Sequence, residues 1–545
     1  MSKQKGLWIL IATILGSSMA FIDSSVVNVA LPRLQIELHA VAASVQWVVE
    51  AYALFLGALI LIGGSLGDQF GRKRIFTLGV VVFALASVAC GLSQNIEQLI
   101  IARSVQGIGG ALLTPGSLAI IRASFGSEQR GKAIGTWSGF SAITSALGPV
   151  LGGWLVQNTS WRWIFFINIP LAIIVLLVSV LHLPESRSEG DRKPLDFPGA
   201  ILTALGLGGV VYGLIQAENG GFADPVVLAC IIGGLIALSL FLFIENRSPA
   251  PMMPLTLFRS RTFSGANLLT LLLYAALGGA LFFLPFNLIS AQGYTATAAG
   301  ASLLPFTLLS FSLSRWSGGL VARYGSRLPL VIGPSIAALG FVLFALPGLG
   351  GSYWQTYFPA VVVLGLGMTI TIAPLTTTVL GAVEDRYSGT ASGVNNAVAR
   401  IASLLAIAIL GIFVVYAFSN SLTRNIEGLH LSSQLQQTIL AQHGRLTGID
   451  IPNTVQGAAR NAIRKAIDES FIAGFRLAML ISAGLALGGA LCALFFISSP
   501  SKLPKYTGEQ QSGDNACTLT YAHQRIDEKD ESGPVTGNDV LPVHK

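Results

Sequence analysis

The sequence predicts an all-α integral membrane protein, and two observations carry this prediction. Of the 545 residues, 52% are hydrophobic and only 11% are charged, which is roughly half the charged share of an ordinary soluble protein. Apolar runs of about 18 residues or more recur along nearly the whole chain, and this is the length that a helix needs to cross a bilayer. The chain is therefore predicted to be a multi-pass helical membrane protein.

We expect about fourteen spanning helices. They cover residues 7–29, 46–66, 75–93, 97–121, 131–157, 161–183, 197–216, 224–245, 263–290, 297–320, 327–347, 354–380, 389–418 and 471–498. The first run follows two lysines, as a secretory signal peptide would. It continues past signal-peptide length without a small-residue cleavage site, so we expect a retained first helix.

Basic residues sort by side of the membrane. The loops of one side hold Lys3, Lys5, Arg72, Lys73, Arg74, Arg122, Arg130, Lys132, Arg187, Arg192, Lys193, Arg247, Arg259, Arg261, Arg323, Arg327 and Arg386. The short loops of the other side hold only Arg33 and Arg162. Because Lys and Arg concentrate in cytoplasmic loops, both termini are expected in the cytoplasm. The membrane is expected to be a bacterial inner membrane or a plasma membrane. The net charge of +7 thus reflects sidedness and not nucleic-acid binding.

Two long connections and two linkers suggest the domain organisation. Residues 419–470 are expected outside, with helical patterning, and the polar tail 499–545 is expected to be disordered and cytoplasmic. Pro-containing segments flank the two helices within 184–262. Removing that pair leaves six helices in residues 1–183 and six in residues 263–498.

Residues 64–74 read Gly-Ser-Leu-Gly-Asp-Gln-Phe-Gly-Arg-Lys-Arg, between two apolar stretches. A charged turn of this kind cannot lie in hydrocarbon, so it must reach water. Its glycines allow two helix ends to approach closely, and Asp68 is placed to pair with a helix end or a basic residue. A fainter copy at 318–327 has Ala322 where the first copy has Asp68.

In the first half of the chain, three ionisable residues are expected inside the membrane, where charge is costly and usually functional. In the second half, Arg400 is expected near mid-membrane. Asp23 lies roughly 24 Å along its helix at 1.5 Å per residue. Glu50 and Arg103 fall in the same outer-half layer, so mutual pairing could offset the loss of solvation. For Glu50 a second interpretation stays open, in which its side chain reaches the membrane interface.

Several ordered strings resemble one family. Phe21-Ile-Asp-Ser-Ser-Val-Val-Asn-Val-Ala-Leu-Pro32, Arg103-Ser-Val-Gln-Gly107, Trp161-Arg-Trp-Ile-Phe-Phe-Ile-Asn-Ile-Pro170 and Gly389-Thr-Ala-Ser-Gly-Val-Asn-Asn-Ala-Val-Ala-Arg400 are similar to motifs of the fourteen-helix drug:proton antiporter family of the major facilitator superfamily. The resemblance implies the major facilitator fold, with two six-helix bundles plus two extra central helices. It also implies multidrug efflux driven by protons, with Asp23, Arg103 and Glu50 as candidates for proton coupling.

The same resemblance assigns two further sets of residues. The 64–74 segment resembles a conformational latch, with Gly64, Asp68, Gly71, Arg72 and Lys73 as its residues. Small residues recur along 131–157 at helical spacing, which permits close helix packing, and Pro149 adds a bend. This helix resembles the antiporter motif of exporters, with Gly139, Gly148, Pro149, Gly152 and Gly153 as its residues.

The second half offers candidates for a substrate cavity, namely Asn267, Tyr274, Asn287, Asn395 and Arg400, although packing explains such residues equally well. The six histidines and four cysteines show no metal or disulfide spacing. No nucleotide-binding loop of the Gly-x-x-x-x-Gly-Lys-Ser/Thr type is present. We therefore expect no cofactor, no metal and no enzymatic activity, with the proton gradient as the energy source.

The sequence as a whole favours a proton-coupled exporter of amphipathic small molecules or drugs that works by alternating access. Its expected partners are its substrate, protons and the lipid bilayer, and a monomeric state is expected. Export of an endogenous lipid, saccharide or metabolite is the alternative. A sensor or scaffold without transport activity is a third, less favoured interpretation, because charges such as Asp23 and Arg103 are retained.

Overall fold

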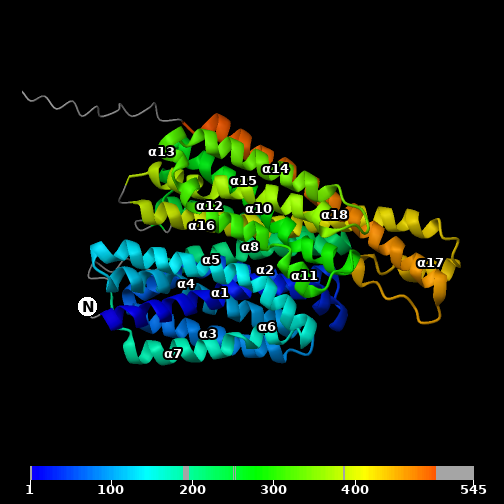
Figure 1. Ribbon diagram of the computed structural model, residues 1–545, viewed down its shortest axis with the longest axis horizontal. Coiled ribbons are helices and arrows are strands. Elements are labelled where there is room, and N and C mark those ends of the chain that lie inside the picture. The colour runs from blue at the N-terminus through cyan, green and yellow to red at the C-terminus, as the bar shows by residue number, and fades with distance from the viewer. Residues whose placement is uncertain (1–2, 188–195, 249–250, 252, 385–386, 499–545) are drawn as a thin grey trace, which may run out of the picture. The chain divides into compact units, whose positions relative to one another are not determined.

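The computed structural model describes residues 3–187, 196–248, 251, 253–384 and 387–498. In these residues the chain is helical without β-strands. The helices run side by side along one long direction, and a hairpin projects from one end (Figure 1). The predicted tail 499–545 lies outside the described residues.

The first part of the chain forms helices whose bounds are α1 Lys3–Glu37, α2 Ala42–Phe70, α3 Arg72–Leu92, α4 Ile96–Ser124, α5 Ser127–Asn158, α6 Trp163–Phe166 and α7 Asn168–His182. They are followed by α8 Phe197–Gly220, α9 Pro225–Arg247 and the 3-10 helix η1 Leu255–Arg259. Local signals set several starts: Asn95 caps α4, and Asp196 caps α8 by accepting from the backbone N–H of Gly199.

The later elements are α10 Arg261–Pro285, the π-helix η2 Phe286–Ala291, α11 Ala296–Ala301, α12 Leu304–Gly318, α13 Leu320–Tyr324, α14 Arg327–Ala345 and α15 Tyr353–Gly381. The last are α16 Ser388–Glu427, α17 Ser433–Leu440, the 3-10 helix η4 His443–Gly448 and α18 Gly457–Phe496.

The described residues contain fourteen helical spans that are long and apolar enough to cross a membrane, which confirms the predicted number. The span predicted at 297–320 is present as a candidate membrane span at Ala296–Ser314, but its helix is interrupted between α11 and α12 and again before α13. Pro305, in the first turn of α12, lacks a backbone N–H and favours a helix start there. The helix predicted over 263–290 likewise changes to a π-helix directly after Pro285.

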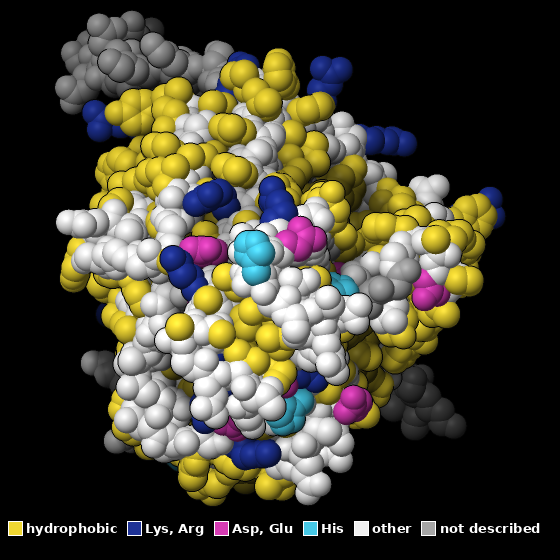
Figure 2. Space-filling view, turned by 90° about the vertical axis from the view of Figure 1, so that its right-hand side faces the viewer, with side chains coloured by type: hydrophobic (Ala, Val, Ile, Leu, Met, Phe, Trp, Pro, Cys, Tyr) yellow, Lys and Arg dark blue, Asp and Glu magenta, His cyan; other side chains and the backbone are white. Residues whose placement is uncertain are grey.

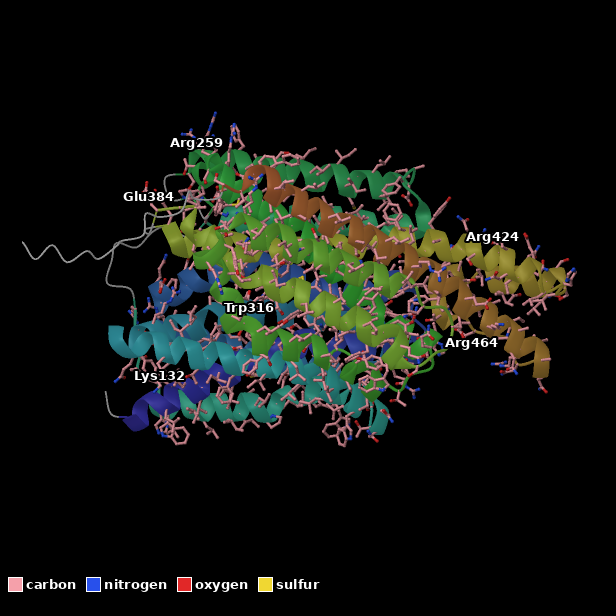
Figure 3. All side chains as sticks on the ribbon, turned by 45° about the horizontal axis from the view of Figure 1, so that its top comes forward. Lys132, Arg259, Trp316, Glu384, Arg424 and Arg464 are labelled. Carbon is pink, nitrogen blue, oxygen red and sulfur yellow. The ribbon has the colours of Figure 1, made fainter. Side chains whose placement is uncertain are left out.

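The two ends of the helical body differ. The end that carries Arg72, Lys73 and Arg74 is called the basic end here, and Lys132 and Arg259 lie at it (Figure 3). The opposite end, which carries α17, is called the hairpin end, and Arg424 and Arg464 lie at it (Figure 3). Helices α16 and α18 run well past the predicted 389–418 and 471–498, because a helix need not stop at the edge of its apolar run.

Two groups of helices pack among themselves. In the first, α2 and α3 pack closely on α4, α5 packs on α1, and α7 lies against α1 and α3. In the second, α10, α14, α15, α16 and α18 form the main contacts. The pair α8 and α9 packs together, and α8 lies against both α2 and α16, where an apolar cluster fills the seam with side chains such as Leu54, Val211 and Leu404.

Candidate functional site

Asp23 of α1 and Arg103 of α4 form a buried ion pair. Nη1 of Arg103 donates to Oδ2 of Asp23 across 2.5 Å, and the two side chains are 0% and 1% exposed. Nε of Arg103 also donates to the backbone oxygen of Val48 in α2, at 2.9 Å. Removing one partner of such a pair typically costs about 3–5 kcal/mol, because the other charge is left uncompensated. The packing thus joins two of the three charges that the sequence placed in one layer.

A polar network surrounds this pair. Gln106 donates from Nε2 to Oδ1 of Asp23 at 2.8 Å and to Oγ of Ser87 at 2.7 Å. Asn168, the first residue of α7, donates to the same Oδ1 at 3.4 Å and to Ser87 at 3.2 Å. Side chains from α1, α3, α4 and α7 therefore share one buried site.

Sequence reasoning did not assign Gln106, Ser87 or Asn168 to this site. For two of them the sequence did offer a signal, because they are polar residues within the quoted motifs. Gln106 lies in the motif at 103–107, and Asn168 lies in the motif at 161–170. Ser87 carries no such signal, because a serine in an apolar helix commonly bonds its own backbone.

Tyr52 of α2 connects this site to the second group of helices. The guanidinium of Arg103 lies 4.3 Å from the centroid of the Tyr52 ring, a cation–π contact. The Tyr52 hydroxyl is buried without a hydrogen-bond partner in the described structure. Arg400 of α16 interacts electrostatically with Tyr52, and its Cβ lies opposite Gly57 of α2. Tyr52 thus contacts Arg103 of the first helix group directly, and Arg400 of the second group interacts with it electrostatically.

Glu50 does not join the Asp23–Arg103 pair, so the expected mutual pairing of all three charges is wrong for this residue. Its side chain is 0% exposed, and neither carboxyl oxygen has a hydrogen-bond partner in the described structure. Full burial by protein also disfavours the interpretation that Glu50 reaches the membrane interface. The carboxyl group of Glu218 in α8 acts on it by like-charge repulsion.

The 64–74 segment makes its contacts within the first helix group. Asp68 pairs with Arg72 one turn later, at 2.7 Å from oxygen to Nη2. Gly71 adopts φ +117°, a backbone conformation that favours glycine. A Glu185 carboxylate lies where a Gly71 side chain would begin and accepts from the backbone N–H of Lys73 at 3.1 Å.

A close approach of α2 to α4 occurs at Gly63, one residue before the 64–74 segment. A Cβ on Gly63 would collide with the backbone oxygen of Ala111 in α4, whereas a Cβ on Gly64 would only touch Pro115 at 3.6 Å. The segment thus begins next to a close α2–α4 contact and reaches Glu185 after α7.

The small residues of α5 pack against two different helices, α1 and α11. Gly148 and Gly152 lie against Ser25 and Val26 of α1. Gly153 meets the backbone of Ala296 in α11, and the Pro149 carbonyl oxygen lies where a Gly300 side chain would begin. At Gly139, nearer the basic end, a side chain would begin with no described atom of another helix within 4 Å. Helix α5 is thus in tight contact with the second helix group at the hairpin end and free of such contact at Gly139.

The hairpin end is closed by a second contact as well. Nε2 of Gln35 in α1 donates to the backbone oxygen of Arg445 at 2.8 Å, and Gly448 lies against the Gln35 side chain. Acidic, basic and histidine side chains gather on this face (Figure 2). The hairpin after α16 therefore rests on α1 of the other helix group.

The candidate cavity residues separate into two places. Nδ2 of Asn395 donates to Oδ1 of Asn267 at 3.1 Å and to Thr270 at 2.7 Å, joining α16 to α10. Ser403, about two turns further along α16, donates to the backbone oxygen of Tyr274 at 3.2 Å. Asn287 does not join them, because its Nδ2 donates to the Tyr357 hydroxyl at 2.9 Å.

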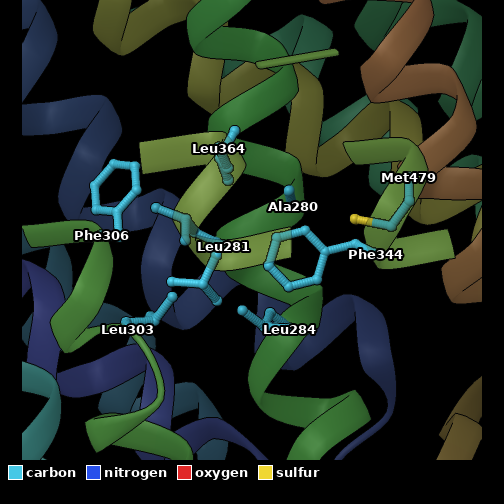
Figure 4. A pocket seen from close by; sticks show the side chains of 9 residues that line it. Ala280, Leu281, Leu284, Leu303, Phe306, Phe344, Leu364 and Met479 are labelled. Carbon is cyan, nitrogen blue, oxygen red and sulfur yellow. The ribbon is translucent and has the colours of Figure 1, made fainter. Parts of the chain in front are cut away.

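An apolar pocket lies within the second helix group (Figure 4). Its lining comes from Ala280, Leu281, Leu284, Leu303, Phe306, Phe344, Val361, Leu364 and Met479. None of the five cavity candidates named from the sequence lines this pocket. For metal ions, the residues that the structure describes contain no group of three or more His, Cys, Asp or Glu side chains suited to binding one.

These features are those of a multi-pass membrane transporter, and comparison with known proteins identifies the family. The Major Facilitator Superfamily profile matches residues 13–407. The tetracenomycin C resistance and export protein of Streptomyces glaucescens is 31% identical over 89% of this chain and 90% of its own. The multidrug resistance protein Stp of Mycobacterium tuberculosis (strain CDC 1551 / Oshkosh) is 32% identical over 87% of this chain and 88% of its own.

Among solved structures, a bacterial homologue of the human lysosomal transporter Spinster, crystallised inward-facing and unoccupied, has a TM-score of 0.63 at 18% identity. The match covers 92% of this chain and 100% of that one, and it supports the fold alone. The chain belongs to the major facilitator superfamily, within its multidrug efflux family.

Proposed function

We propose that this protein exports amphipathic small molecules across the cell membrane in exchange for protons, by alternating access. The observation that carries the proposal is the buried Asp23–Arg103 pair and its network. A carboxylate held by one arginine changes its main interaction when it takes up a proton. A ligand can shift a conformational equilibrium only through such a difference between states.

Orientation follows from the distribution of charge. The basic end, with Arg72, Lys73 and Arg74, is assigned to the cytoplasm together with both termini. The hairpin end then faces outward. Because α5 meets α11 at the hairpin end and stands free at Gly139, the described arrangement corresponds to a state closed to the outside.

The proposed cycle uses this asymmetry. In the state closed to the outside, Asp23 is ionised and paired with Arg103, and substrate enters from the cytoplasmic side. Opening toward the outside exposes Asp23 to a proton, which weakens its attraction to Arg103. The 64–74 segment and the small face of α5 are proposed to hold the alternative contacts of the two states, as two helix groups rock about a central site.

The substrate class rests on the relatives, which are named for resistance to and export of tetracenomycin C and for multidrug resistance.

The test is proton release from everted membrane vesicles that contain the protein, measured against a panel of cationic dyes and metabolites. Substrate-dependent proton movement that Asp23→Asn abolishes is the expected result. Proton-independent uptake of every compound that is transported would contradict the proposal. A response to metabolites but to no dye would favour the endogenous-substrate alternative.

A further inference from the structure

A second acidic cluster lies where α2, α8 and α16 meet. Glu50 and Gln46 are four residues apart on α2, so they occupy the same helix face. Nε2 of Gln46 donates to Oε1 of Glu218 in α8 at 2.7 Å. Gly411 of α16 leaves room for this hydrogen bond, because a Cβ at this position would overlap both Oε1 of Glu218 and Nε2 of Gln46.

The cluster contains buried acceptors that lack donors. Both carboxyl oxygens of Glu50 and Oε1 of Gln46 are buried without a hydrogen-bond partner in the described structure. The Glu50 and Gln46 side chains are 0% and 1% exposed. Burying an acceptor without a donor is strongly unfavourable, and burying an unpaired charge more so. One proton on Glu50 would remove the charge and supply a donor to the neighbouring amide oxygen.

The charges on the surrounding elements do not offer another solution. Charged and titratable residues on or beside the elements packed against α2 and α8 include Asp23 on α1, the bases at 72–74 on α3, Arg103 on α4, Asp224, Glu245 and Arg247 on or beside α9, Arg400 on α16, and His443 and Arg445 on η4. Arg103 is already held by Asp23, and in the described structure Glu50 accepts no hydrogen bond from any of these residues. The seam around the cluster is otherwise apolar.

We propose that Glu50, Gln46 and Glu218 form a second protonation site, separate from the Asp23–Arg103 pair, in which the two carboxyl groups hold one proton between them. Two carboxylates in one buried site cannot both ionise readily, so a shared proton is the expected resting state. The group bound is proposed to be a proton, because the cluster has only two carboxyl groups and the described residues contain no group of three or more His, Cys, Asp or Glu side chains suited to a metal ion.

The location gives this site a role. It joins α2 of the first helix group, α16 of the second and α8 of the central pair. A change in its protonation therefore acts on contacts between the two helix groups. That role in the transport cycle rests on the proposed function, whereas the binding of the proton does not.

The site is tested by infrared spectroscopy of the purified full-length protein in lipid, titrated with acid and base. Wild-type protein should show the carbonyl stretch of buried protonated carboxylic acids, lost in two steps because coupled groups titrate as a pair. The single variants Glu50→Gln and Glu218→Gln should each show only one step in the loss of this carbonyl stretch. The double variant, which carries both substitutions, should show neither step. Glu97→Gln, at an exposed position in the first turn of α4, is the control and should match wild type.

A double variant with the wild-type spectrum would overturn the site, as would wild-type protein that shows both carboxyls ionised at neutral pH. The role is tested in everted vesicles, where the double variant should release fewer protons per substrate than wild type, while export coupled through the Asp23–Arg103 pair continues. An unchanged ratio would overturn the role. Failure of the proposed function would instead appear as no substrate-coupled proton release in wild type, with the spectral titration intact.

Discussion

Arg103 and Asp23 face one another across 2.5 Å in the interior of the first helix group, with no more than 1% of either side chain exposed. Arg103 is fixed from a second direction by Val48 and from a third by the Tyr52 ring. The arginine can therefore keep its position when the aspartate changes charge. This arrangement, with one changeable charge against one fixed charge, suits a proton-driven conformational change.

The pair yields the first prediction. Asp23→Asn should abolish export driven by a pH gradient while downhill substrate exchange continues, because the amide cannot carry the charge change. Arg103→Ala should lower expression as well, since an unpaired buried carboxylate typically costs about 3–5 kcal/mol. Transport in everted vesicles and the yield of folded protein measure the two effects. Full gradient-driven export by Asp23→Asn would direct attention to Arg400 instead.

The second prediction concerns the 64–74 segment. Asp68→Asn should slow cycling but leave folding almost unchanged, because a partly exposed i,i+4 pair contributes only about 0.3–0.5 kcal/mol. Glu185→Gln should have a similar effect, since it removes the charge that meets Gly71 and Lys73. Initial transport rates normalised to the amount of protein in the membrane provide the measurement. Wild-type rates for both variants would show that this segment only connects two helices.

The third prediction follows from the unequal contacts along α5. Gly153→Leu should disfavour closure at the hairpin end, because the added side chain meets the backbone of α11. A cysteine introduced at Gln157, which accepts from the backbone N–H of Thr297, should then react faster with maleimide. Gly139→Leu is the matched control, since that position is open in the described state. Equal labelling rates in the two variants would contradict this account of α5.

The fourth prediction concerns orientation. A cysteine at Ser433 in α17, in a background without the native cysteines, should react with an impermeant maleimide in intact cells. A cysteine at Lys132 should react only after the cells are opened. The two positions lie at opposite ends of the helical body. The reverse pattern of labelling would place the hairpin end in the cytoplasm and would reverse the direction of the proposed cycle.

Sequence and tertiary structure contributed differently to this picture. The fourteen spans were predictable because a bilayer requires every backbone polar group to bond within its own helix over a fixed apolar length. Depth was predictable too, since each residue advances a helix by about 1.5 Å. That is why Asp23, Glu50 and Arg103 could be placed in one layer.

The direction in which a side chain points around its helix depends on how neighbouring helices pack, and one sequence does not contain that information in readable form. Only the packing of α1 on α4 brought Asp23 to Arg103, and only the packing of α2 on α8 joined Gln46 to Glu218. The same limit applies to Gly63, Gln106 and Ser87, whose roles arise from contacts with other helices. The sequence by itself determined how many helices cross and at what depth the charges lie; the tertiary structure decided which charges meet, because partner choice is set by helix packing in three dimensions.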